Sequence, residues 1–242
     1  MSRVVGLVVL ALVALAAPAQ AESVTRPPVR DNTLFEDAQG SLSNGAGPGL
    51  FCGRISLGGV RRALLAFHPA GALPPGAVLD SVRLELHVQA SSDGQPRILG
   101  LHRVLTDWGE GASFSSGGSG AAAQPGDATW IHTFYSGSFW ANPGGDFVPA
   151  ASATTSVGVT DGLCTWSSPA LTADVQAWLA NPSTDFGWML RGEESTAGTA
   201  RRFDSRESPT AAWRPRLLLF FSSSTPARPW SWGRLQTLYL NR

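Results

Sequence analysis

The sequence predicts an all-β protein, a jelly-roll-like antiparallel β-sandwich with one short helix and long loops. Its 242 residues include 27 glycines, 17 prolines and nine tryptophans, a composition typical of short strands joined by turns. Alternation of apolar and polar residues recurs along the chain and supports the same fold class. A chain of this length can form one large β domain.

Residues 1–21 have the features of a secretory signal peptide. Arg3 lies in a short basic start, residues 4–17 are apolar, and Ala-Gln-Ala at 19–21 resembles a cleavage site. The apolar run is shorter than the roughly 20 residues that a membrane-spanning helix needs. We therefore expect an exported protein, secreted or held in the cell envelope, with no integral membrane segment after cleavage.

One domain is expected over residues 22–222, because no interior segment resembles a linker between domains. Residues 223–242 follow it as a flexible spacer and a short amphipathic tail. This tail either docks on a partner or rests on its own domain, and the sequence favours neither.

Period-two patterns predict the strands in order. Residues 62–67 form the first, and Pro74-Pro75-Gly76 then predict a crossing loop, since proline cannot join a sheet interior. In residues 82–88, valine and leucine alternate with Arg83, Glu85 and His87, as in a half-buried strand. Further strands are expected at 98–105 and 186–191, and the apolar run 217–221 suits a strand covered on both faces.

The middle of the chain, residues 108–166, has a different character. Small-residue loops at 113–127 and 151–162 flank an aromatic-rich stretch at 129–147. Long loops in compact domains are usually functional or disordered. The crowded aromatic residues favour an ordered loop packed on the sandwich.

One helix is predicted after this region, lying across an open end of the sandwich. Thr172 is the expected N-cap, and Asn181-Pro182 end the helix. Asp174 lies near the N-terminus, where its charge suits the helix dipole. The apolar face comprises Leu171, Val175, Trp178 and Leu179.

Charge and cysteine content exclude some partners. The net charge is zero and the pI is about 6.9, so the chain lacks the basic field that nucleic acids or anionic membranes require. Cys52 and Cys164 are the only cysteines, and export favours their oxidation into one disulfide. Two distant thiols offer too few soft ligands for a metal site.

A dense charged run, Arg-Arg-Phe-Asp-Ser-Arg-Glu, occupies residues 201–207 in a chain that is only 15% charged. Unpaired charge beside a core is costly, so we expect Asp204, Arg206 and Glu207 to form a structural ionic network. Arg201 and Arg202 are the better ligand candidates, because forked guanidinium groups can grip uronate carboxylates.

Six segments together resemble the DNRLRE-domain family of secreted bacterial proteins, which is related to a carbohydrate-binding module family. They lie at 44–54, 61–67, 101–111, 129–147, 171–179 and 201–207, within a match over residues 24–222. The resemblance implies a jelly-roll-like sandwich without catalytic residues, and some relatives bind acidic polysaccharides such as alginate. The family usually lacks cysteine at the positions of Cys52 and Cys164, so their joint presence supports a disulfide.

The aromatic stretch has the chemistry of a saccharide platform. Sugar rings present C–H faces that stack on aromatic planes, while their hydroxyls need polar partners. The candidate ligand-binding residues are Trp130, His132, Tyr135, Trp140, Asp146, Arg201 and Arg202, with Asn142 in the same stretch. Tryptophans in a sandwich also often belong to the core, and we assign Trp108, Trp166, Trp178 and Trp188 to the core or its edge.

A structural calcium ion is a hypothesis at this stage. Oxygen ligands from separated loops are available, although no EF-hand pattern is present. The candidate ligands are Asp107, Glu110, Asp127 and Asp146.

No enzyme motif stands out, and we expect a protein that is not an enzyme. Residues 117–121, Gly-Gly-Ser-Gly-Ala, miss the last position of the G-x-S-x-G elbow. The adjacent Glu193 and Glu194 would diverge, unlike carboxylates that flank a glycosidic bond.

The sequence therefore predicts a secreted, non-catalytic protein resembling a carbohydrate-binding module, for acidic or cell-surface polysaccharide. The alternative is a structural or adhesive exoprotein, whose sandwich is a spacer and whose tail makes the specific contact. Exposure of Trp140, Tyr135 and Arg201 on one surface would favour binding, and burial of all three would favour the spacer.

Overall fold

The computed structural model describes residues 21–89, 91 and 93–223. The predicted signal peptide lies outside these residues except for Ala21, and the predicted tail lies outside them except for Ser223. Within the described part of the chain, no helix has the length and apolar character needed to cross a membrane.

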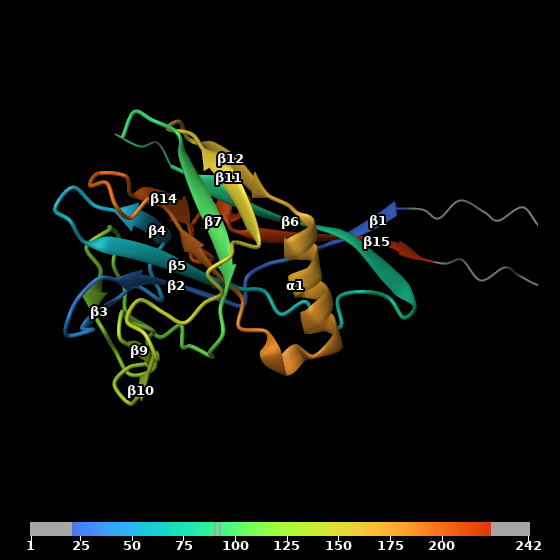
Figure 1. The fold of residues 1–242 in the computed structure, drawn as a ribbon, viewed down its shortest axis with the longest axis horizontal. Helices are drawn as coiled ribbons and strands as arrows, with labels where there is room; N and C mark the ends of the chain where they lie inside the picture. Colours follow the sequence, from blue (N-terminus) through green and yellow to red (C-terminus); the bar gives the residue numbers. More distant parts are fainter. Residues whose placement is uncertain (1–20, 90, 92, 224–242) are drawn as a thin grey trace, which may run out of the picture.

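The described residues form an antiparallel β-sandwich with one α-helix (Figure 1). The strands are β1 (Ala21–Arg26), β2 (Arg30–Phe35), β3 (Leu42–Ser43), β4 (Gly49–Arg54), β5 (Val60–Ala66), β6 (Ala77–Val88), β7 (Arg97–Arg103), β8 (Ala121–Ala122), β9 (His132–Phe134), β10 (Ser138–Phe139), β11 (Ala153–Val157), β12 (Gly162–Trp166), β13 (Trp188–Arg191), β14 (Arg201–Asp204) and β15 (Arg216–Ser223). The helix is α1 (Pro169–Ala180), and short 3-10 turns occupy Pro182–Thr184 and Ala211–Trp213. The fold class predicted from the sequence is confirmed.

Two layers make up the sandwich, and β4 belongs to both. We call the layer of β1, β15, β6, β12 and β14 sheet A, and the layer of β2, β5, β13, β7 and β11 sheet B. Residues 49–52 of β4 pair with β14 in sheet A, whereas Gly53 and Arg54 pair with β5 in sheet B. Gly53 has φ +101°, a conformation that residues with a side chain rarely adopt. The strand therefore changes sheets at a glycine.

The main core fills the space between the two sheets. From β6 it takes the predicted apolar face, and from sheet B the buried Leu101, Trp188 and Leu190. Burial of each such side chain contributes about 1.5–3 kcal/mol. The residues of β6 in this core are Val82, Leu84, Leu86 and Val88.

Helix α1 lies beside β6 at one end of the sandwich (Figure 1), as predicted. Its N-cap is Ser168 rather than Thr172, because the Ser168 hydroxyl accepts a hydrogen bond from the Leu171 N–H at 3.0 Å. Pro169 then occupies the first turn, where its missing N–H has no cost. Trp178 packs against Trp188, with ring centroids 4.5 Å apart, so the helix closes the main core.

The segment 151–162, expected to be a loop, instead contains strand β11. β11 pairs with β7 at the end of sheet B, and Ala153 and Val157 turn inward. Its intervening residues are threonine and serine, which are suited to an edge strand. With only two apolar positions, the alternation was too weak to predict this strand.

The two cysteines are not bonded, so the predicted disulfide is wrong in this structure. Cys52 lies on β4 and Cys164 on β12, with β14 and β6 between them. Three strand spacings separate the two positions by about 14 Å, whereas a disulfide needs Cα atoms within about 7 Å. An exported location favours disulfide formation but carries no information about the distance between the two cysteines.

Thiol titration tests the unbonded state. Cys52 is fully buried and Cys164 half-buried, and burial raises the pKa of both thiols. We expect a thiol-reactive dye at pH 8 to label Cys164 slowly in the native protein and both cysteines in urea. Dithiothreitol should leave the Tm unchanged. Finding no reactive thiol in urea would contradict the structure.

Replacing Gly53 with alanine should destabilise the protein by about 2–3 kcal/mol in urea unfolding. A Cβ at this position would lie 3.0 Å from the Thr199 carbonyl oxygen and 3.1 Å from the Ala200 Cα, in addition to the strain of a positive φ. Gly76→Ala is the matched control, since Gly76 also has positive φ but no atom within 4 Å of the added Cβ. We expect about 1 kcal/mol there. Equal losses would exclude crowding at the strand corner.

Candidate functional site

The aromatic stretch predicted as a saccharide platform forms a second core on the outer face of sheet B. The loop after β7 crosses this face and packs Trp108 and Trp140 on Leu34, Leu64 and Met189. Trp140 is 5% exposed, and its indole Nε1–H donates to the Thr129 carbonyl at 2.9 Å. A buried indole with its polar atom satisfied is typical of a core residue.

The other members of the stretch are also held within the loop. His132 is buried, and its Nδ1 lies 2.9 Å from the Thr129 hydroxyl. Its ring contacts the half-buried Tyr135 and the exposed Phe139, at centroid distances of 5.0 and 4.7 Å. Half-buried Trp130 packs under the guanidinium of Arg62, 4.9 Å from its ring centroid.

The Asp146 carboxylate stabilises the turn that precedes it. It accepts hydrogen bonds from the backbone N–H groups of Ala141 and Asn142, at 2.7 and 3.0 Å, and from the Asn142 side chain. The residues predicted to bind sugar therefore do not gather on one open surface.

Arg201, predicted as a ligand residue, is 1% exposed. Its guanidinium donates to Asp93 at 2.8 Å and to the Ser91 hydroxyl at 2.9 Å. Hydrogen bonds from Arg97 and Arg201 hold the pKa of Asp93 well below its usual range. Arg202 is half-buried over the Phe51 ring, at 5.8 Å. Arg201 thus compensates a buried charge and does not face solvent.

Among the predicted structural residues of the charged run, Arg206 and Glu207 lie in ion pairs, and Asp204 contacts a histidine. Asp204 contacts His87 Nδ1 at 2.9 Å and accepts from the Ser208 hydroxyl at 2.9 Å. Arg206 contacts Glu110 at 2.6 Å and Glu207 at 3.4 Å.

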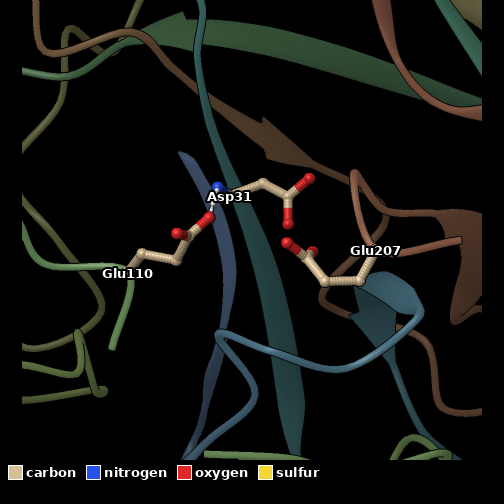
Figure 2. Close-up of side chains that lie close together, drawn as sticks. All are labelled: Asp31, Glu110 and Glu207. Atoms are coloured by element: carbon tan, nitrogen blue, oxygen red, sulfur yellow. Dashed lines mark hydrogen bonds between the residues drawn. The ribbon is translucent and has the colours of Figure 1, made fainter. Parts of the chain in front are cut away.

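Three carboxylates, those of Asp31, Glu110 and Glu207, form an acidic cluster between sheet B and the loops that follow β7 and β14 (Figure 2). One oxygen from each lies within 4.8 Å of the others. Burial, followed by the charges of Glu207 and Glu110, raises the pKa of Asp31 well above its usual value, and burial also raises the pKa of Glu207. The cluster has the donor atoms of a site for a hard metal ion.

Of the four predicted calcium ligands, only Glu110 belongs to this cluster. Asp107 pairs with Arg30 at 2.6 Å, and buried Asp127 accepts from the Gln124 N–H at 2.7 Å. The sequence did not identify Asp31 as a ligand, because the only indication was its acidic side chain within the strand-forming segment 30–35.

A second feature missed from the sequence is Trp213, on the outer face of sheet A. It is 41% exposed, and its ring stacks on His87 with centroids 4.6 Å apart and planes 3° apart. Asp204 and Asp161 hold the two ring nitrogens of His87, at 2.9 and 3.1 Å. The available signal was a tryptophan in a polar, proline-flanked turn at 208–215.

A groove of about 320 Å³ runs along β11 and β12, and its lining includes Asp161, which contacts His87. Asp161 and the exposed Leu163 line it together with the half-buried Cys164. We call the outer face of sheet A around Trp213, His87 and Asp161 the Trp213 face.

Comparison with known proteins adds no identification, since no protein-family model and no curated protein matches the chain.

Glu193 and Glu194 point to different partners. Glu194 makes bidentate contacts with Arg62 and further contacts with Arg191, at 2.7–3.2 Å. Glu193 bonds to Ser195. Burial opposes ionisation of Glu194, but the hydrogen bonds from the two arginines prevail and lower its pKa from 4.5.

Glu194→Gln should reduce stability at pH 7 by about 1–3 kcal/mol, because the charge-assisted bonds to two partly buried arginines are lost. A lowered folded-state pKa stabilises the protein above pH 4.5 and loses this effect as the pH falls through the folded value. Urea unfolding from pH 7 to pH 3 should therefore show the variant and the wild type converging in acid. The control, Glu193→Gln, should unfold like the wild type at pH 7. A constant difference across the pH range would contradict this assignment.

Proposed function

We propose that the chain is a non-catalytic carbohydrate-binding module of an exported protein, in line with its resemblance to DNRLRE domains. We place the saccharide contact on the Trp213 face, instead of the aromatic loop that the sequence suggested.

The stacked pair of Trp213 and His87 is the observation that carries this proposal. An exposed indole offers a flat apolar plane to the C–H face of a sugar ring. His87 supports the indole from beneath and is itself held by two carboxylates. A plane held in place before binding loses little conformational entropy when the ligand arrives.

Polar groups around the pair favour hydroxyl-rich, neutral sugars over acidic ones. Asp161 is exposed at the groove and can accept hydrogen bonds from sugar hydroxyls. Arg216 lies 2.8 Å from Glu85, which Arg83 also approaches at 3.9 Å. Because both guanidinium groups have a carboxylate within ion-pair distance, their attraction for a polyuronate is weakened.

A non-catalytic role is supported by the position of the acidic cluster. A glycosidase needs two carboxylates facing a substrate across a cleft. Asp31 is only 1% exposed, and three grooves on the described surface are lined by other residues.

The second candidate is a structural exoprotein in which the sandwich acts as a spacer. It is favoured by the burial of Trp140 and Arg201, whose indole and guanidinium groups form their hydrogen bonds inside the domain. The specific contact would then come from residues 223–242, almost all of which lie outside the described part of the chain.

Affinity electrophoresis of the full exported chain distinguishes the two candidates. We expect retardation in gels containing a neutral polysaccharide such as xylan, mannan or β-glucan, and weaker retardation with alginate. Trp213→Ala should weaken binding about 5-fold or more, since an aromatic stacking contact contributes about 1 kcal/mol or more.

Phe139→Ala is the matched control, because Phe139 is an exposed aromatic residue outside the Trp213 face. It should bind like the wild type. If the Trp213→Ala variant were retarded as strongly as the wild type, saccharide binding at the Trp213 face would be refuted. No retardation of the wild type on any gel would favour the spacer role.

A further inference from the structure

We infer that Asp31, Glu110 and Glu207 form a binding site for one calcium ion, with a role separate from saccharide binding at the Trp213 face. The three ligands come from β2, from the loop after β7 and from the turn after β14. An ion there would join segments that are more than 70 residues apart in the sequence.

The spacing of the carboxylates fits one coordination shell. Calcium binds oxygen at 2.3–2.6 Å, so two ligands on one ion can be at most about 4.6–5.2 Å apart. One oxygen of each of the three carboxylates lies within 4.8 Å of the others. Figure 2 shows the three side chains converging from separate segments.

Two carboxylate oxygens of the cluster lack a partner. Asp31 is only 1% exposed, and its Oδ2 accepts a hydrogen bond from the Arg206 N–H at 2.8 Å. Among the described residues, neither Asp31 Oδ1 nor Glu207 Oε2 has a hydrogen-bond partner, and both atoms are buried. Buried polar atoms are nearly always satisfied, so these two oxygens point to a missing ligand.

The net charge of the cluster favours binding of a divalent cation. Arg206, which contacts Glu110 and Glu207, is the cation paired within the cluster. Three ionised carboxylates and one guanidinium leave a net charge of −2, and an uncompensated buried charge is strongly unfavourable. A calcium ion would neutralise this charge and give Asp31 Oδ1 and Glu207 Oε2 a partner.

The donor set favours calcium among the metals. All three ligands offer oxygen, which suits hard cations, and the cluster has no thiolate or imidazole for zinc or copper. Magnesium demands near-octahedral geometry and retains several waters, whereas calcium tolerates irregular, carboxylate-rich sites.

Calcium titration of the full exported chain, first treated with a chelator and then dialysed, tests the site. Isothermal titration calorimetry should show one calcium ion per chain, with a Kd of about 10⁻³ M or tighter, as in extracellular calcium modules. The Tm should rise with calcium concentration. Magnesium should give a smaller shift at the same concentration.

Asp31→Asn should abolish both the binding heat and the calcium-dependent rise in Tm. The substitution keeps an oxygen that can accept from the Arg206 N–H and removes one of three mutually repelling charges, so we expect the variant to fold in chelator. If it does not fold, Glu207→Gln, at a more exposed ligand than Asp31, provides the same test. The control is Glu194→Gln, a carboxylate outside the cluster, which should keep the full calcium response.

Two results would overturn the inference. One is a wild type with no binding heat and no Tm change in millimolar calcium, which would leave a shared proton between the carboxyl groups as the explanation. The other is an Asp31→Asn or Glu207→Gln variant that binds calcium like the wild type.

Discussion

Sheet B is covered on both faces, and most other features of the domain depend on this constraint. Its inner face packs on sheet A, while its outer face, with Leu34, Leu64 and Met189, lies beneath the loop after β7. An apolar sheet face left in water would lose its hydrophobic stabilisation. The loop therefore contributes Trp108 and Trp140 to a second core, which explains why these two rings of an aromatic-rich, glycine-rich segment point inward.

A long loop packed on a sheet also buries its own polar groups, which need partners. Asn32 supplies several, since its side-chain amide donates to the Ser43 hydroxyl and to the Glu110 carbonyl, at 2.9 and 2.8 Å. Arg62 links Glu194 to the Gly144 carbonyl in the same manner. These bonds fix the loop against the sheet, and the acidic cluster at its margin is where the compensation is least complete.

Pattern-based prediction succeeded where local periodicity reports burial directly. The alternation in residues 82–88 identified the inward face of β6, because side chains in a strand alternate between its two faces. It did not reveal that Glu85 and His87 on the other face are also buried, at 7% and 8% exposure. Their burial depends on Arg216 and Trp213, which reach them from segments more than 120 residues later.

The sequence by itself determined the all-β class, the main strands, the helix and the four tryptophans of the interior, because periodicity, turn residues and hydrophobicity act over a few neighbouring residues. Only the tertiary structure decided the candidate site. It separated Cys52 from Cys164 by two intervening strands, buried Trp140 and Arg201, and brought Asp31 to Glu110 and Glu207. These outcomes depend on which distant strands become neighbours, and the energy that selects this pairing is spread over the whole core.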